Sequence, residues 1–381
     1  MSKTLMVGTG FSGVGRISLL GCKRLNNISQ LIKSLFANNE QGFAYDPNDL
    51  TTMYQDATGT VPVTGAGQPV GLVLDKSKGI ALGEELFLNS EFNSQDGWNL
   101  SPNVSINNGA LKFTEASAAR ARYTVNTKAA TWYLFSIDIA SNPSGLLGLR
   151  VGGVLLTGYV SKTGRLHVFY LSATAGVIDF DIVCSTLATT AEINSASLKE
   201  IKGNHAYQTT SASRPILRQN VTTGAYYLEF DGTDDFLQTA VSLPFPVTAV
   251  APFDFKSKDT IKCILSAGAT GYLRSTETAA SVHSTSGSVS IAKKKVDVLL
   301  HELTGDSVNI RTNVDGIMIS NIDIPAKNSY LALNKYIGSF SNTHTALRAA
   351  MDLYGMVAIR KLLTTSEEAE IRAHFNKRMG I

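Results

Sequence analysis

Apolar and polar residues alternate through the middle of the chain, between residues 80 and 202. The stretch 120–141, RARYTVNTKAATWYLFSIDIAS, follows a two-residue period, and further short apolar runs follow it. Turn-forming residues separate these runs about every 8–12 residues. A two-residue period places successive side chains on opposite faces of a strand, so one face is buried and the other is not. The pattern predicts an antiparallel β-sandwich over residues 80–202.

Short strand-like runs also lie on both sides of this region. Residues 43–79 hold turn signals between brief apolar runs, and residues 203–363 continue as strands up to the segment DLYGMVAIRKLL. Many Thr, Ser, Val and Tyr residues together with 32 Gly favour strands joined by turns. The chain is therefore predicted to be all-β outside its two ends.

Helical spacing marks both ends. Residues 28–36, ISQLIKSLF, have apolar side chains three and four apart, which predicts a short amphipathic helix. This helix either docks onto a partner or covers its own sandwich. Residues 365–380 predict a C-terminal helix that Thr365 or Ser366 caps, with acidic residues in its first turns and Gly380 at its end.

Composition narrows the class of protein. A length of 381 residues with 44% apolar residues suffices for two or three domains with real cores. A net charge of +3 is too small to predict a nucleic-acid partner. No apolar run approaches the ~20 residues that span a bilayer, and no signal peptide is evident. Three widely spaced cysteines, Cys22, Cys184 and Cys263, lack metal-ligand spacing and fit folding in a reducing cytoplasm.

Two local patterns have simple interpretations. Gly8, Gly10 and Gly13 form a G-x-G-x-x-G pattern, but no acidic residue follows at the distance that a dinucleotide site needs, so we interpret the stretch as a glycine-rich arm. The basic run Lys293–Lys295 is interpreted as a solvated turn or strand edge.

The flanking segments resemble a known family. The segments YDPNDLTTMYQD and PVGLVLDKS in 43–79, followed by GNHAYQTTSASRPIL and YLEFDGTDDFL from residue 203, resemble the laminin-G-like (concanavalin-type) sandwich of tailed-phage virion and tail proteins. In that family these segments form one continuous opening, whereas here residues 80–202 separate them. The resemblance implies a discontinuous domain of 43–79 plus 203–381, preceded by an arm and helix in 1–42. Residues 79 and 203 are then expected to lie close together.

The inserted segment resembles a second family. ELFLNSEFNS, GWNLS, NGALKFT, WYLFSIDI and ASLKEI occur in the order found in carbohydrate-binding-module-like, galactose-binding-like jelly rolls, and they cover residues 85–201. Relatives place an acidic pair where this chain has Ile193, Asn194 and Ser195. Its loss puts in doubt the structural Ca²⁺ site that Glu85 and Asn89 would otherwise share.

Glycan binding is what this second resemblance implies. Such modules stack an exposed aromatic ring on a sugar, so Tyr159, beside Gly158 in an expected loop, is the preferred candidate. Trp132 is a second candidate, although a core or rim position is an alternative for it. Trp98 is expected in the core. Arg120 and Arg122 alternate on one strand face, which places both at the solvent or at a ligand surface.

Acidic residues suggest metal ligands at two places. Asp231, Asp234 and Asp235 surround a predicted Asp-Gly turn and could hold Ca²⁺, with turn formation as the alternative. Asp46, Asp49 and Asp56 are interpreted mainly as residues that cap turns or a short helix. No other cofactor is expected.

These observations predict a virion structural protein, associated with the tail tip, baseplate or fibre, that binds host-surface polysaccharide. The expected partners are other virion proteins through the N-terminal arm and further copies of the chain in a homotrimer, without nucleic acid or membrane insertion. The protein would assemble in the host cytoplasm. A decorating or bracing protein of the capsid, collar or tail is the alternative, and a glycan-degrading tail enzyme is a lesser one. The sequence contains no HExxH or G-x-S-x-G motif, so we expect no enzyme.

Overall fold

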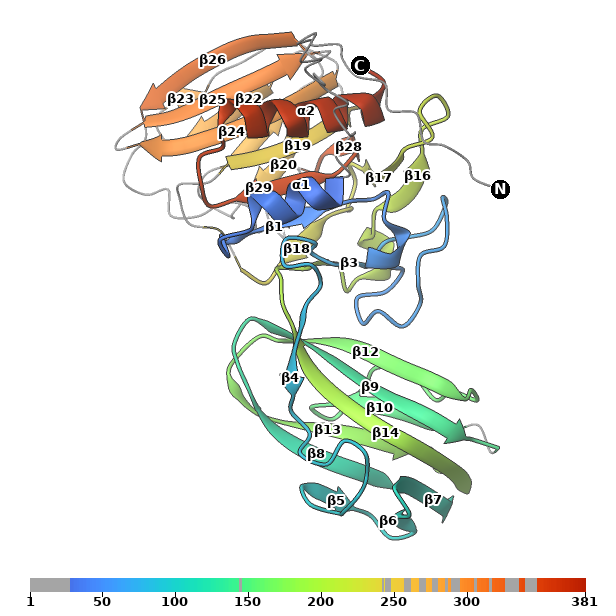
Figure 1. Ribbon diagram of the computed structural model, residues 1–381. Helices are drawn as coiled ribbons and strands as arrows, with labels where there is room; N and C mark the ends of the chain where they lie inside the picture. The colour runs from blue at the N-terminus through green and yellow to red at the C-terminus, as the bar shows by residue number, and fades with distance from the viewer. Residues whose placement is uncertain are drawn as a thin grey trace, which may run out of the picture.

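The computed structural model describes residues 28–143, 146–241, 243, 248–256, 336–339 and 348–381, and it gives the backbone of the strands between residues 262 and 325 (Figure 1). The glycine-rich arm with Cys22, together with Lys293 and Lys294, lies outside the described residues. None of the helices that are described is long and apolar enough to cross a membrane. The predicted fold class, all-β with a helix near each end, is confirmed.

The larger of two β-sandwiches, here called the outer sandwich, takes its strands from both sides of the segment 80–202. Its first sheet contains β16 (Ile216–Gln219), β17 (Tyr226–Asp231), β28 (Ala350–Leu353), β19 (Thr248–Phe255), β24 (Lys295–Thr304), β25 (Ser307–Val314) and β26 (Ile317–Pro325) in that order, with β1 (Gly42–Tyr45) and β29 (Met356–Ile359) joined beside β19. Its second sheet contains β2 (Met53–Tyr54), β3 (Leu72–Val73), β15 (Ala206–Tyr207), β18 (Leu237–Thr239), β27 (Tyr336–Ile337), β20 (Lys262–Ser266), β21 (Tyr272–Ser275), β22 (Ala280–Ser284) and β23 (Gly287–Ser288). One-turn 3₁₀ helices occur at Leu50–Thr52 and Ser211–Ser213.

The smaller sandwich, here called the inserted sandwich, lies within residues 82–201. Its five-stranded sheet contains β11 (Val154–Leu155), β10 (Leu147–Val151), β13 (Gly176–Cys184), β8 (Arg120–Thr127) and β5 (Trp98–Leu100). Its six-stranded sheet contains β12 (Gly164–Ser172), β9 (Thr131–Ser141), β14 (Thr189–Ile201), β7 (Ala110–Ala116) and β6 (Val104–Asn107), with β4 (Leu82–Glu85) paired to β14.

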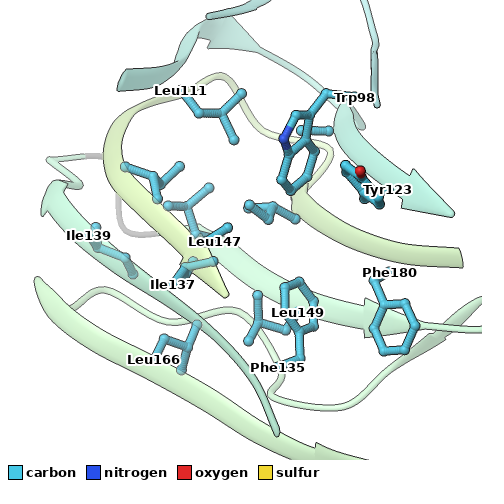
Figure 2. Packing of buried hydrophobic residues seen from close by; sticks show 14 of the residues in the cluster. Trp98, Leu111, Tyr123, Phe135, Ile137, Ile139, Leu147, Leu149, Leu166 and Phe180 are labelled. Atoms are coloured by element: carbon cyan, nitrogen blue, oxygen red, sulfur yellow. The ribbon is translucent and has the colours of Figure 1, made fainter. Parts of the chain in front are cut away.

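Each sandwich has its own apolar core. In the inserted sandwich Phe135 and Ile137 from β9 meet Leu149 and Phe180 from the opposite sheet (Figure 2). Trp98 is buried in this core, as the sequence predicted, and its indole N–H donates to the carbonyl oxygen of Asn89. Burial of such side chains supplies the main driving force for folding, at roughly 25 cal/mol per Å² of apolar surface.

Both helices cover the first sheet of the outer sandwich. Helix α1 (Ile28–Leu35) buries its apolar face against Val357 and Ile359 of β29 and against Phe375 of helix α2 (Thr365–Met379) (Figure 1). The alternative in which α1 covers its own sandwich is thus the observed one. The N-cap of α2 is Thr364 rather than Thr365 or Ser366, because the Thr364 side chain and Glu367 form a capping box.

The chain leaves and rejoins the outer sandwich at one place. The backbone N–H of Lys202 donates to the carbonyl oxygen of Ala81 at 2.9 Å, which continues the pairing of β14 with β4. The N–H of Asn204 then donates to Oδ2 of Asp75 at 2.8 Å. Residues 79 and 203 were expected to be neighbours. The two hydrogen bonds join residues 81 and 202 and residues 75 and 204, so the segments that contain residues 79 and 203 lie side by side.

Candidate functional site

Trp132 is not an exposed aromatic platform, and its candidacy as a glycan-stacking residue is corrected here. Only 2% of its surface is exposed, and its ring meets His205 and Tyr207 edge-on at 5.5 and 5.4 Å between ring centroids. Trp132 belongs to an apolar cluster that joins the two sandwiches, in which the inserted sandwich also contributes Phe169, and the outer sandwich contributes Leu72. The ring therefore serves the contact between the sandwiches.

A hydrogen bond and a close approach complete this contact. The N–H of Phe169 donates to the carbonyl oxygen of Thr58 at 2.8 Å. Gly59 lies against the Phe169 ring, where a Cβ atom would come within 2.2 Å of it, and its φ of +68° also favours glycine. The two sandwiches thus meet through packed side chains as well as through the covalent connection.

Arg120 and Arg122 lie on the outward face of the five-stranded sheet, on β8. Arg122 donates from Nε to Asp181 Oδ1 at 2.7 Å and also pairs with Asp179 at 2.7 Å. Arg150 reaches the same Asp181 from the other side, so this buried carboxylate is shared by two guanidinium groups. The hydrogen bond to Asp181 is the main cause of a raised pKa at Arg122. Arg122 is thus already occupied by carboxylates.

Tyr159 is the exposed aromatic that the sequence favoured. It is 47% exposed in the loop after β11. The preceding Gly158 carbonyl lies over Gly148 of β10, on the same outward face as Arg120 and Arg122. Arg120 and Arg122 therefore share one face of the five-stranded sheet, the loop that carries Tyr159 lies beside that face, and Trp132 is separated from them. Their role in glycan binding remains a prediction.

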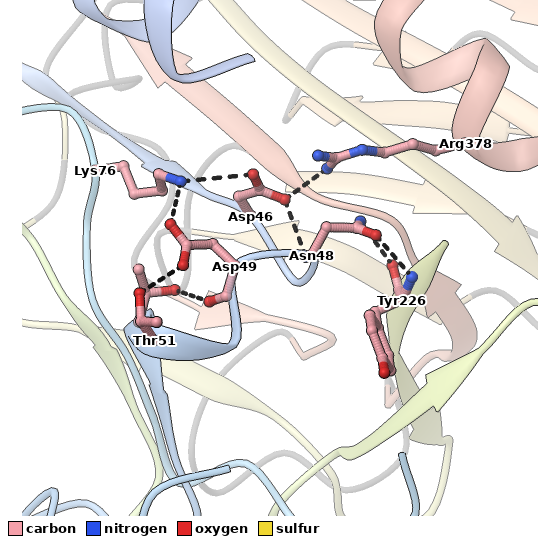
Figure 3. Close-up of polar contacts among 8 residues, drawn as sticks. Asp46, Asn48, Asp49, Thr51, Lys76, Tyr226 and Arg378 are labelled. Carbon is pink, nitrogen blue, oxygen red and sulfur yellow. Dashed lines mark hydrogen bonds and ion pairs between the residues drawn. The ribbon is translucent and has the colours of Figure 1, made fainter. Parts of the chain in front are cut away.

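The second acidic group, Asp46 and Asp49, holds the outer sandwich together rather than a cation. Asp46 accepts from Arg378 Nη1 at 2.6 Å and lies 3.6 Å from Lys76, and its other contact is the N–H of Asn48 in its own turn (Figure 3). Asp49 accepts from Lys76 at 2.5 Å and makes no side-chain cap. The expectation of turn capping is therefore met by Asp46. Asp49 occupies the N-cap position of the one-turn 3₁₀ helix, but its carboxylate accepts from the Thr51 hydroxyl at 2.6 Å and not from a backbone N–H. Lys and Arg cations occupy the places that a metal would need.

Asp56 caps a turn, as expected. Its carboxylate accepts from the backbone N–H groups of Thr58, Thr60 and Val61 and from both threonine hydroxyls. These bonds order the loop that carries Gly59 against the inserted sandwich.

Asp231, Asp234 and Asp235 do come together after β17. One carboxylate oxygen from each lies within 4.8 Å of the others. Asp231 Oδ1 accepts from the backbone N–H groups that follow it, which is the turn alternative, while Asp234 accepts from Ser213. Asp235 Oδ2 accepts from the backbone N–H of Asp231 at 3.0 Å. Carboxylate oxygens at this spacing suit Ca²⁺, although several of them already accept hydrogen bonds within the turn. Calcium binding here remains a prediction.

The acidic cluster predicts a pH-dependent stability. Burial, followed by the charges of Asp231 and Asp234, raises the pKa of Asp235 to about 7. Its ordinary pKa is near 3.9, so the folded state holds a proton that the unfolded state releases, and stability falls as pH rises from about 4 to about 7. We expect Asp235→Asn to raise the free energy of unfolding by on the order of 2–4 kcal/mol at pH 8 and to change it little near pH 4.

The measurement is urea denaturation of both forms across this pH range, with EDTA present so that no cation neutralises the cluster. Burial also raises the pKa values of Asp75 and Asp352 to about 6, so these residues lower the stability in the same direction as pH rises. Both residues are present in the native protein and in the variant, so their contributions cancel when the two proteins are compared at equal pH. An equal gain at pH 4 and pH 8 would show that the charge of Asp235 is not the cause.

Sequence reasoning missed a groove on the outward face of the six-stranded sheet. It is a cleft of about 380 Å³, within the usual range of small-molecule sites. Three adjacent strands, β12, β9 and β14, supply its floor, and β4 supplies one wall. It is lined by Leu82, Leu134, Ser136, Ile137, Asp138, Arg165, Ser195, Ser197 and Lys199.

Strand register explains how these side chains meet. Ser195, Asp138 and Arg165 lie directly opposite one another on β14, β9 and β12, and Ser197 lies beside Ser136 one pleat further on. Each side chain points away from the core because the alternate residues of the same strands fill it. The two-residue period over residues 120–141 places Leu134, Ser136 and Asp138 on one face of their strand, but only the strand order adds Arg165 and Ser195.

Hydrogen bonds within the protein occupy some of the polar groups that surround the groove and leave others able to bind a ligand. Glu85 accepts from Ser197 at 2.6 Å and from the N–H of Leu198 at 2.7 Å, so this carboxylate anchors β4 to β14. Asn194 donates to Asp138 at 3.0 Å. The hydroxyl of Ser195 has no hydrogen-bond partner among the described residues. The groove thus presents hydroxyl, carboxylate and cationic groups around an apolar floor.

The fold and the groove define a two-sandwich β-protein with a polar cleft on one sheet. No protein-family model matches the sequence, and no curated protein matches it either. Among solved structures, a tandem of CBM22 domains from Paenibacillus barcinonensis Xyn10C is 10% identical, with 74% of this chain and 99% of that one covered and a TM-score of 0.29. A Trypanosoma rangeli sialidase in complex with sialic acid is 8% identical, with 72% and 62% covered and a TM-score of 0.32.

A third similar structure is a GH2 β-galacturonidase from Eisenbergiella tayi, which is 9% identical over 57% of this chain and 38% of that one, with a TM-score of 0.19. The expectation that this chain is not an enzyme is therefore corrected, because glycan-active enzymes are among the structures that resemble it. TM-scores of 0.19 to 0.32 are too low for these similarities to assign an architecture or a reaction to the chain.

Proposed function

We propose that the protein binds glycans through the groove on its six-stranded sheet. The observation that carries the proposal is the groove itself, in which hydroxyls of Ser136 and Ser195, the carboxylate of Asp138 and two cationic side chains surround Leu134. Saccharides present many hydroxyl groups on a partly apolar ring. A cleft that mixes hydrogen-bonding groups with an apolar floor matches that chemistry.

We further propose that the protein is a structural component of a tailed-phage particle, at the tail tip, baseplate or fibre, where the groove contacts host-surface polysaccharide. This assignment rests on the resemblance of the segments around YDPNDL, LDKS and GNHA to virion proteins. Weak single sites gain useful avidity when several copies act together, which favours a homotrimer. Attachment to other virion proteins would fall to the arm that precedes α1, because α1 itself is packed on its own sandwich.

A bracing role on the capsid, collar or tail is the second candidate. It is favoured by the apolar contact through Trp132 and Phe169, which holds the inserted sandwich against the outer one as a spacer would require. Imaging of intact particles by electron microscopy with an antibody to the inserted sandwich distinguishes the two, because a capsid or collar position would rule out a receptor-binding role.

The glycan proposal predicts a loss of binding when the groove is changed. The double variant Asp138→Ala/Arg165→Ala removes one charge of each sign and leaves the net charge unchanged. Hydrogen bonds to charged groups contribute about 1.5–3 kcal/mol each, so we expect at least a tenfold weaker binding to host-surface polysaccharide. Surface plasmon resonance with immobilised polysaccharide measures it.

The matched control is Lys112→Ala/Glu192→Ala, which removes an exposed ion pair of 3.5 Å on β7 and β14 outside the groove. It should bind as the native chain does. Tyr159→Ala and Arg120→Ala test the face of the five-stranded sheet in the same assay. If these two weaken binding and the groove variant does not, the glycan site lies on that face and the groove proposal fails.

A further inference from the structure

The cationic side chains of the groove are not neutralised by the protein. Arg165 lies directly opposite Asp138 in the β12–β9 register, yet no ion pair within 4 Å forms between them. Arg165 donates instead to Ser136 Oγ, in a long contact of 3.4 Å, and Asp138 is held by Asn194. Lys199 has no carboxylate or hydrogen-bond partner among the described residues.

Four other basic residues of the inserted sandwich are paired with carboxylates, whereas Arg120 and Lys162 have no such partner among the described residues. Arg122 and Arg150 share Asp181, Lys112 pairs with Glu192, and Lys128 pairs with Glu200 at 2.5 Å. These pairs show that carboxylates are available on this sandwich and that basic residues engage them where the register allows. The groove keeps its two cations apart from such partners.

Arg165 is the cation of the groove that remains available to a ligand. The lining contains two cations and one carboxylate, and a second carboxylate, Glu85, accepts from the lining Ser197 and lies opposite Lys199 in the β14–β4 register, so the charges of the two signs balance. His167, next to Arg165 on the outward face of β12, has a pKa that is lowered first by burial and then by the charges of Arg165 and Lys162. A guanidinium without a carboxylate partner gives the anionic part of a ligand a defined place in the cleft.

We propose, on the basis of the glycan-binding function above, that the groove selects saccharides that carry a carboxylate, such as uronic or sialic acid units. Arg165 receives the carboxylate, since the planar guanidinium matches a carboxylate with two parallel N–H donors. Asp138 and Ser195 hydrogen-bond the ring hydroxyls of the same unit. Lys199 lies four residues from Ser195 along β14, about 13 Å of strand, and meets an acidic group further along the polymer.

The test compares matched polymers on the full chain. Polygalacturonate, hyaluronate and polysialic acid are each offered beside the same polymer with its carboxyl groups reduced to alcohols, and dextran sulfate serves as a non-carboxylate polyanion. We expect at least one carboxylated polymer to bind tenfold or more tightly than its reduced form and than dextran sulfate. Isothermal titration calorimetry measures the affinities.

Variants test the roles of single residues. Arg165→Lys keeps the positive charge but loses the two parallel N–H donors of the guanidinium. It should weaken binding of the carboxylated polymer by about tenfold and should change binding of the reduced polymer little. Lys199→Ala should weaken binding and reduce its salt dependence. Lys128→Ala removes the same charge outside the groove and should have no effect. Circular dichroism confirms that each variant is folded.

The outcomes separate this inference from the proposed function. If carboxylated and reduced polymers bind equally, and Asp138→Ala/Arg165→Ala loses both, the groove is still the glycan site but the selectivity for acidic units is overturned. Equal binding of dextran sulfate and the carboxylated polymers overturns it too, because charge alone then suffices. Failure of every carboxylated and reduced polymer to bind overturns both proposals.

Discussion

Replacing Asp75 by alanine is expected to lower the free energy of unfolding by about 4–6 kcal/mol, enough to unfold many domains. Asp75 is fully buried and accepts four hydrogen bonds of 2.8 Å, from the backbone N–H groups of Ala44, Ser77 and Asn204 and from the Ser77 hydroxyl. Each buried donor left without a partner costs about 1–3 kcal/mol. Its own N–H donates to Nδ1 of His205, whose pKa burial lowers to about 3.

A second variant keeps this prediction testable if the alanine variant does not fold. Asp75→Asn retains one acceptor oxygen for Ala44 and Ser77 but turns an NH₂ group toward the N–H of Asn204, so about half of the loss is expected. Asp49→Ala, at a partly exposed carboxylate of the same region, should cost under about 1 kcal/mol. Urea denaturation followed by tryptophan fluorescence measures all three. A loss at Asp75→Ala no larger than at Asp49→Ala would contradict the structural role of Asp75.

Replacing Trp132 by alanine is expected to cost about 3–5 kcal/mol and to loosen the contact between the two sandwiches. The ring fills the space between His205 and Tyr207, and neighbouring Phe169 and Leu72 close around it. With the ring removed, the inserted sandwich remains tied mainly through its two connecting segments. Denaturation measures the stability, and small-angle X-ray scattering measures the change in overall dimensions.

The control for this prediction is Tyr159→Ala, which removes an exposed aromatic ring from the same sandwich. Surface substitutions of this kind usually stay within about 0.5 kcal/mol, and no change in scattering is expected. If Trp132→Ala matched this control in both measurements, the contact between the sandwiches would contribute little to holding them together.

Local periodicity predicted much of the inserted sandwich. The two-residue alternation of 120–141 places Leu134, Ser136 and Asp138 on one face of β9, and the structure agrees. The burial of Trp98 was implied by the resemblance to jelly-roll modules, and the structure agrees with it as well. Arg165 and Ser195 could not be added to that face, because alternation within a strand says nothing about which strands become neighbours. For Trp132 the buried alternative is the observed one. A period-two pattern could not decide between the alternatives, because it does not distinguish a face covered by a second sandwich from a face exposed to solvent.

The family-like segments LDKS and GNHA predicted that residues 79 and 203 lie close together, but not the contact that joins them. The hydrogen bond between Asp75 and Asn204 links residues 129 positions apart, and no local pattern indicates which side chain of one segment meets the backbone of the other. Conversely, the acidic residues Asp231, Asp234 and Asp235 lie within one turn, and for such short-range groups the predicted closeness follows from chain geometry alone.

The shared junction at Ala81 and Lys202 determines how the molecule responds to tension. A pull on the inserted sandwich reaches the outer one through β4 and β14, which run antiparallel and leave from the same point. Both connecting segments are stretched together, so the hydrogen bonds between them are not sheared. Beyond the junction the load passes through Asp75 to β1, next to the helices that cover the outer sandwich.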